Sequence, residues 1–141
     1  HFGCQIIEHT IVPDDADRIA QVIKSYADSG IELILTTGGM SVDPDDVTPS
    51  GIKKTGAEIV TYGAPVLPGA MILVAYLGSI PILGLPGCVM YHKTTVFDLI
   101  LPLVLTGQKI SRKHLVKLGK GGLCLQCAEC RYPACSFGTG A

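Results

Sequence analysis

The 141-residue sequence contains no tryptophan, few charged side chains (16%) and no long uninterrupted apolar run. Its longest apolar run, residues 96–105, is interrupted by Asp98 and Pro102. That run is far shorter than the about 20 residues that a membrane-spanning helix needs. We therefore expect no membrane span, and we assign the 48% hydrophobic content to buried strands.

An excess of charge of either sign is also missing. Eleven lysines and arginines stand against twelve aspartates and glutamates, which gives a net charge of −1. Because binding to a phosphate backbone requires a basic surplus, we expect no nucleic-acid partner. The sequence begins at His1 without a methionine, a basic segment or an apolar segment of the kind found in signal peptides. We therefore expect no signal peptide, and we interpret the sequence as a fragment. The reducing cytoplasm is the expected compartment, because it matches cysteines that are clustered as in a metal site.

The six cysteines are distributed unevenly. Two of them, Cys4 and Cys88, stand alone, whereas four lie close together near the end: Cys124, Cys127, Cys130 and Cys135. Gaps of two, two and four residues bring four thiolates within reach of one centre, which favours metal binding over a disulfide scaffold. Bacterial ferredoxins share the first two gaps but have a third gap of three residues followed by proline. An iron–sulfur cluster and a zinc ion both remain open, and so does a purely structural role for the metal.

The first half of the sequence predicts strands that alternate with helices. A β-branched segment over 5–8 predicts a strand, and Asp14 or Asp15 can cap a helix whose apolar residues repeat with helical spacing up to Gly30. The apolar run 33–35 predicts a strand covered on both faces, as is typical of parallel sheets.

The second half predicts a hairpin and further helices. The predicted elements are a helix from Thr48 as N-cap to about Gly56, a strand over 58–62, strands over 71–77 and 80–83, and a largely buried helix over 89–105, bent at Pro102. Gly78 and Ser79 join the paired strands in a two-residue connection that suits a type II′ turn. This alternation predicts an α/β fold with helices on both faces of the sheet.

Two glycine-rich turns are candidates for an anion site. One is Thr36-Thr37-Gly38-Gly39-Met40-Ser41, and the other is Gly84-Leu85-Pro86-Gly87. Each follows a predicted strand, and ligands of open α/β sheets bind where the carboxyl ends of strands meet helix starts. The alternative is that these glycines only permit tight turns.

Three carboxylates lie between the two turns. Asp43, Asp45 and Asp46 beside an anion site would repel a phosphate unless a hard cation such as Mg²⁺ bridges them. The alternative is a solvated acidic loop in which Asp46 or Thr48 caps the following helix.

These motifs resemble those of the molybdopterin-binding domain family. The resemblance rests on Ile11-Val12-Pro13-Asp14-Asp15, on the first glycine-rich turn, on Asp46-Val47-Thr48-Pro49 and on Gly84-Leu85-Pro86-Gly87, in that order. It covers about residues 5–107. It implies a three-layer α/β/α sandwich with a mostly parallel sheet, whose loops bind the dithiolene pterin and its phosphate.

The family divides into two chemistries. One branch transfers AMP from ATP to molybdopterin, and the other uses adenylated molybdopterin and molybdate, inserting the metal and releasing AMP. Residues 46–49 resemble the first branch and residues 38–42 resemble the second, and we expect the second. The alternatives are the adenylyltransferase, a non-catalytic binding module, and a redox sensor gated by the cysteine tail.

The resemblance also implies site residues and partners. Asp14 and Asp46 would hold Mg²⁺ and orient the phosphate, as expected catalytic residues. The expected substrate-binding residues are Thr37, Gly38, Gly39, Ser41, Thr48, Pro86 and Gly87. Separately from the resemblance, the cysteine spacing gives Cys124, Cys127, Cys130 and Cys135 as the expected ligands of a 4Fe–4S cluster or Zn²⁺. The partners would be molybdopterin, molybdate, a nucleotide and a second copy of the chain.

Two features depart from the family pattern. Cys88 and Val89 stand where relatives have Asn or Ser and then Pro, which removes a polar contact. The family also begins with a strand and a helix that nothing before His1 supplies, so we expect the 141-residue chain alone to be poorly soluble and inactive. The resulting domain prediction is a pterin-binding domain over 1–107, a linker over 108–122 and a metal-binding tail over 123–141.

Overall fold

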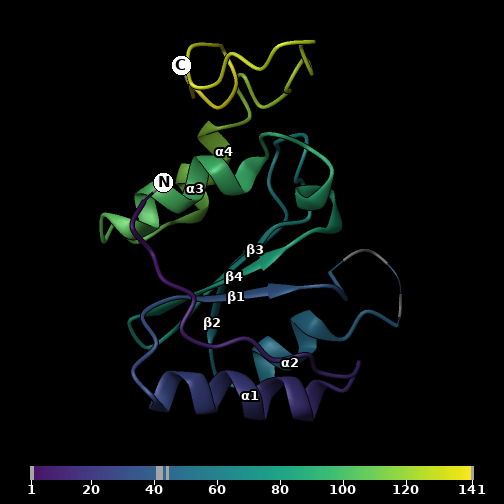
Figure 1. Ribbon diagram of the computed structural model, residues 1–141, viewed down its shortest axis with the longest axis vertical. Coiled ribbons are helices and arrows are strands. Elements are labelled where there is room, and N and C mark those ends of the chain that lie inside the picture. Colours follow the sequence, from purple (N-terminus) through teal and green to yellow (C-terminus); the bar gives the residue numbers. More distant parts are fainter. Residues whose placement is uncertain (1, 41–42, 44, 141) are drawn as a thin grey trace.

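The computed structural model describes residues 2–40, 43 and 45–140 (Figure 1). In chain order its elements are α1 (Ala16–Asp28), β1 (Ile34–Thr37), α2 (Thr48–Lys54), β2 (Glu58–Tyr62), β3 (Leu73–Leu77), β4 (Ile80–Leu85), the 3-10 helix η1 (Gly87–Met90), α3 (Val96–Leu105) and α4 (Arg112–Lys117). Among these residues, no helix is long and apolar enough to cross a bilayer.

The four strands form one sheet in the order β1-β4-β3-β2. Only β1 and β4 pair in parallel, whereas the β4–β3 and β3–β2 pairs are antiparallel. The α/β class is confirmed, but the sheet is mixed rather than mostly parallel. The reason is the short connections, because a parallel neighbour needs a crossover of a dozen or more residues and β3 reaches β4 through only Gly78 and Ser79.

Helices cover both faces of the sheet, so the three-layer arrangement is confirmed (Figure 1). On one face, Ile19 and Ile23 of α1 and Ile52 of α2 pack against the sheet. On the other face, Ile100 of α3 and Leu115 of α4 pack against it. The central strand β3 is buried from both sides.

Three predicted elements agree closely with the structure. β2 has the predicted bounds, and the 3.6-residue repeat of α1 ends before Gly30, whose φ of 83° suits the left-handed turn after a helix. The β3–β4 hairpin is also confirmed. Gly78 has a φ of 61°, the conformation that the first residue of the turn requires.

The predicted strand over 5–8 is wrong. These residues form no strand, and Ile6 and Ile7 are 91% and 70% exposed. A strand propensity becomes a strand only where a neighbour offers a pairing edge. The expected two-sided cover of the apolar run 33–35 is also wrong for Leu35, which is 46% exposed on the edge strand β1.

The predicted long helix over 89–105 is wrong at its start. The 3-10 turn η1 ends at Met90, and α3 begins only after Thr95. Thr95 and Asp98 form a reciprocal capping box there, in which Thr95 Oγ1 accepts from the Phe97 amide and Asp98 Oδ2 accepts from the Thr95 amide. This capping box marks the N-terminal end of a helix inside the apolar segment 89–105.

The segment predicted as a linker, 108–122, contains α4 and contributes to the core. Ile110 and Leu115 are each 1% exposed, and the Ile110 amide donates to the Tyr76 hydroxyl at 2.8 Å. The division of the chain at 107 and 122 stays a prediction, but 108–122 packs against the sheet's helical layer and is not a free tether.

Candidate functional site

The parallel pair β1–β4 brings the two glycine-rich turns to one edge of the sheet. Thr37 is in register with Leu85, so Gly38 and Pro86 leave the sheet side by side. The turns also touch. A Cβ added to Gly84 would lie 2.5 Å from Cε of Met40 and 3.0 Å from Cβ of Leu73, which shows how closely Met40 packs there. The expectation that both turns serve one site is therefore consistent with their geometry.

Asp14 and Thr48 converge on Gly39 from two other segments. A Cβ added to Gly39 would lie 2.7 Å from Thr48 Oγ1 and 3.6 Å from Asp14 Oδ1. Gly39 has a φ of 56°, a region that glycine adopts without steric cost. The missing side chain thus lets three motifs that are distant in sequence meet.

Thr48 does not cap α2 with its side chain, contrary to the prediction. The N-cap position is Val47, and Thr48 Oγ1 instead donates to the Gly38 carbonyl at 3.0 Å. Thr48 is 6% exposed and Gly38 is exposed, so this bond is partly shielded from water. Its hydroxyl therefore ties the start of α2 to the first glycine-rich turn.

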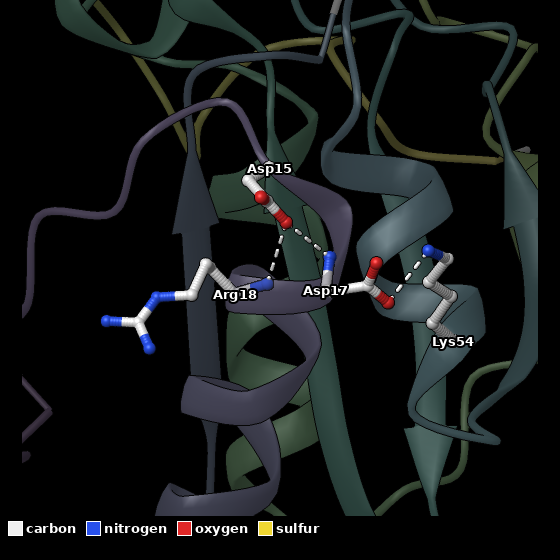
Figure 2. A network of polar contacts seen from close by, with 4 residues as sticks. All are labelled: Asp15, Asp17, Arg18 and Lys54. Atoms are coloured by element: carbon white, nitrogen blue, oxygen red, sulfur yellow. Dashed lines mark hydrogen bonds and ion pairs between the residues drawn. The ribbon is translucent and has the colours of Figure 1, made fainter.

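Asp15, rather than Asp14, caps α1. Its Oδ1 accepts from the amides of Asp17 at 2.8 Å and Arg18 at 3.0 Å (Figure 2). The amide bonds from Arg18 and Asp17 lower the pKa of the Asp15 carboxyl, because they favour its charged form. The capping position that could have explained Asp14 thus belongs to its neighbour, and the Asp14 carboxylate lies near Gly39 instead.

An ion pair joins the two helices that flank this point. Lys54 Nζ lies 2.8 Å from Asp17 Oδ1 and links the end of α2 to the first turn of α1 (Figure 2). Both side chains are largely solvated, so the pair contributes little stability. Close packing holds the helices together more firmly, since a Cβ on Gly51 would lie 2.6 Å from Cγ2 of Ile19.

Within the acidic loop, Asp46 remains a candidate cation ligand, whereas Asp43 has a local structural contact. Asp43 shapes a local turn, because its Oδ1 accepts from the Asp45 amide at 3.2 Å. This contact supports the alternative of a structural loop for Asp43. Asp46 is half-buried just before α2. In the described part of the chain, no three His, Cys, Asp or Glu side chains are arranged to hold a metal ion.

Tyr62 is a residue at this edge that the sequence analysis missed. It ends β2, and burial, followed by the negative charge of Asp46, raises the pKa of its phenol. The effect of Asp46 shows that the two side chains are electrostatic neighbours. In the sequence, the feature that could have identified Tyr62 is its position at the carboxyl end of the predicted strand over 58–62.

The other predicted substrate-binding residues lie at the same edge. Thr37 and Gly38 are exposed at the end of β1, Pro86 is buried, and Gly87 is exposed at the start of η1. Ser41 lies outside the described residues. The Thr36 hydroxyl oxygen is buried and has no hydrogen-bond partner among the residues that the structure describes.

The four tail cysteines line one cavity far along the chain from this edge. It has a volume of about 220 Å³ and lies between the tail and the segment before α3. Thr94 Oγ1 lies 3.5 Å from Cys130 Sγ. The hydrogen bond with Thr94, and then a backbone bond at Tyr132, lower the pKa of the Cys130 thiol. The structure therefore brings the four cysteines around a common space.

A family model described as "Probable molybdopterin binding domain" matches residues 1–106. The chain belongs to this molybdopterin-binding domain family. The family expectation from the glycine-rich and Asp-Val-Thr-Pro motifs is thereby confirmed.

Individual relatives carry related names. The domain is 28% identical over 74 residues to a molybdopterin molybdenumtransferase of Synechococcus elongatus, which covers 52% of this chain and 18% of that protein. It is 29% identical over 112 residues to the molybdopterin molybdenumtransferase of Haemophilus influenzae, covering 78% of this chain and 27% of that protein. It thus spans about a fifth to a quarter of the length of these two relatives.

Two solved structures share the fold. A molybdopterin biosynthesis MoeA protein of Pyrococcus horikoshii matches with a TM-score of 0.52 and 26% identity, covering 67% of this chain and 22% of that chain. The MoaB protein of Thermus thermophilus matches with a TM-score of 0.50 and 25% identity, covering 69% of this chain and 72% of that chain. This molybdopterin-binding domain therefore has structural relatives in both kinds of protein.

Proposed function

We propose that this domain takes part in molybdate insertion, converting adenylated molybdopterin and molybdate into molybdenum cofactor with release of AMP. The observation that carries the proposal is the convergence of Asp14 and Thr48 on Gly39, beside the turn that follows β4. Several relatives bear the name molybdopterin molybdenumtransferase, which favours this reaction over adenylylation. Adenylylation of the pterin phosphate by ATP is the second candidate, since Asp46-Val47-Thr48-Pro49 resembles the adenylyltransferase branch.

The proposed ligand contacts follow from the local geometry. Gly38 and Gly39 present backbone amides without obstructing side chains, and the Thr48 bond keeps that turn in place. Thr37, Ser41, Pro86 and Gly87 complete the proposed phosphate and pterin contacts. The buried Thr36 hydroxyl, which lacks a partner within the described residues, is a further polar group beneath the turn.

Asp14 and Asp46 are proposed to hold Mg²⁺. The donor set fits, because Mg²⁺ in such sites is bound through one or two carboxylates together with substrate phosphates rather than by an all-protein cage. The ion would neutralise charge on the phosphoanhydride whose cleavage releases AMP. We propose that Asp14, whose Oδ1 would lie 3.6 Å from a Cβ at Gly39, orients the ligand in either reaction.

The proposal also covers the partners of the chain and its place in the cell. The substrates are small molecules, and we propose that the chain acts in the cytoplasm as a homo-oligomer. The relatives are several times longer than this chain, so a complete reaction cycle in this chain is itself part of the proposal.

Incubation of the protein with adenylated molybdopterin and molybdate tests the proposal. We expect AMP release, and Asp46→Asn should abolish most of it while leaving the fold intact. Asp45→Asn is the matched control, because Asp45 is an exposed neighbour in the same loop. Pyrophosphate release from ATP and molybdopterin would instead identify the adenylyltransferase. Tight pterin binding with neither product, or wild-type rates from folded Asp46→Asn protein, would overturn the proposal.

A further inference from the structure

A pocket of about 220 Å³ lies between α4 and the loop that follows β2. Val116, which is 60% exposed, and Tyr62, which is 40% exposed, form part of its rim. The Thr61 hydroxyl, which also lines it, is already bound to the Gly63 carbonyl at 2.8 Å. The walls of this α4 pocket are therefore mainly apolar, and they come from Tyr62, Ala64, Pro65, Leu115 and Val116, with Arg112 beside them.

The α4 pocket is held open by packing within the chain. Leu115 is 1% exposed and anchors α4 in the core. At the end of α4, a Cβ added to Gly119 would lie only 3.1 Å from Cγ of Pro65, so the helix and the loop are in close contact. The Leu67 amide also donates to the Gly122 carbonyl at 2.6 Å. A ligand would thus meet a preformed pocket, which lowers the entropic cost of binding.

The surface around α4 is strongly basic. Residues 99–128 contain five lysines and arginines and no aspartate or glutamate, whereas the rest of the chain holds the other six and all twelve acidic residues. The five are exposed, and they are Lys109, Arg112, Lys113, Lys117 and Lys120. Lys109 lies 3.5 Å from Glu58, and the other four have no ion pair among the residues that the structure describes. The net charge of −1 therefore conceals a cationic surface at one end of the molecule.

The cations lie directly beside the apolar pocket. Arg112 and Val116 are one helical turn apart along the pocket, and Lys113 and Lys117 are one turn apart on the adjoining side of α4. No aspartate or glutamate of the described chain lines the pocket. Asp46 is the acidic neighbour on the far side, where its charge acts on Tyr62. An apolar hollow is thus bordered by positive charge on its α4 side.

We propose that the α4 pocket and the basic residues beside it form a docking surface for a partner protein that presents an apolar side chain flanked by carboxylates. The apolar side chain fills the pocket, and the carboxylates meet Arg112, Lys113 and Lys117. Tyrosine and arginine beside a hollow that a partner side chain can fill are typical of the energetic centre of protein interfaces. A nucleic-acid backbone would satisfy the cations but has no apolar group for the pocket, so the pocket favours a protein.

The docking surface lies next to the proposed pterin site, because Tyr62 belongs to the rim of the pocket and is also the neighbour of Asp46. The proposal does not depend on the pterin chemistry. Neither glycine-rich turn contributes a residue to the pocket.

The experiment measures binding of short fluorescent peptides to the full chain by fluorescence anisotropy. The probe has one leucine flanked by glutamates on both sides, and a second peptide has glycine in place of the leucine. We expect the leucine peptide to bind about tenfold more tightly, because only its side chain can fill the apolar pocket. Binding of both should weaken as salt is added.

Two variants with the same change in charge test the location. Lys117→Glu should weaken binding of the leucine peptide about tenfold, whereas Lys24→Glu, on the exposed face of α1 at the other end of the molecule, should change it less than about twofold (Figure 1). Val116→Glu, at the rim of the pocket, should remove the preference for leucine over glycine. Thermal unfolding of each variant checks that the fold is retained.

Several results would overturn the proposal. These are equal affinity for the leucine and glycine peptides, equal losses in folded Lys117→Glu and Lys24→Glu, and no binding of either peptide. Tighter binding of single-stranded polyuridylate, or of vesicles that contain phosphatidylserine, would likewise replace the protein partner with a nucleic acid or a membrane surface.

Discussion

The contact between Gly39 and Thr48 can be tested with two neighbouring glycines. Both Gly38 and Gly39 have positive φ, 83° and 56°, so alanine at either position carries a left-handed backbone cost of about 1–2 kcal/mol. At Gly38 the added Cβ meets no atom within 4 Å, whereas at Gly39 it lies 2.7 Å from Thr48 Oγ1. Gly38→Ala therefore isolates the backbone cost, and Gly39→Ala adds the collision.

The collision displaces the Thr48 hydroxyl from the Gly38 carbonyl. A hydrogen bond of this kind contributes about 0.5–1.5 kcal/mol. We therefore expect Gly39→Ala to lower the free energy of unfolding by about 2–3 kcal/mol, against about 1–2 kcal/mol for Gly38→Ala. Urea unfolding with an unchanged m-value measures both.

A double-mutant cycle makes this test sharper. Thr48→Ala removes the oxygen that the new Cβ meets, so Gly39→Ala combined with Thr48→Ala should be less destabilised than the sum of the two single variants. Strict additivity, or equal losses in Gly38→Ala and Gly39→Ala, would refute the inferred contact. Pterin binding should fall more in Gly39→Ala than its stability loss explains, because Asp14 also approaches this point.

Two further predictions concern the core and the first helix. Tyr76→Phe leaves the buried Ile110 amide without its acceptor and should cost about 1–3 kcal/mol in thermal or urea unfolding. Tyr91→Phe, at a site 81% exposed, should change stability by less than about 0.5 kcal/mol, and equal losses would contradict the prediction. Because its amide bonds lower the folded pKa of Asp15 below 3.8, its cap contributes stability that is present above that value. That contribution is lost as the pH falls from 3.8 through the lower pKa of the folded state. Over this pH range the wild-type protein should lose stability faster than Asp15→Asn. Parallel profiles of stability against pH for the two proteins would refute this prediction.

Several elements could be predicted from the sequence, because they depend on local hydrogen bonding and on the spacing of apolar residues. α1 needs only a capping carboxylate and an apolar face repeated every three or four residues, both of which are encoded within a short stretch. The β3–β4 hairpin likewise depends on a glycine at a two-residue turn. The capping box at Thr95 and Asp98 was equally local, and a search for that pattern inside 89–105 would have found the start of α3.

The candidate site depended on contacts that local sequence does not encode. Both Asp14 and Asp15 suit a helix cap, and only the packed structure shows that Asp15 takes that role while Asp14 approaches Gly39. Thr48 could have capped α2, but the nearness of Gly38 gave its hydroxyl a different acceptor. Tyr62 entered the site because the strand order placed the end of β2 at the same edge.

The sequence by itself therefore determined the family, the order of the glycine-rich motifs and the spacing of the tail cysteines. The tertiary structure decided which of these residues meet, because strand pairing across distant segments sets the loops of β1 and β4 side by side. It also decided the shape of the tail site. The docking of Phe137 and Tyr132 on α3 brings all four tail cysteines to the lining of one cavity, which their spacing alone did not show.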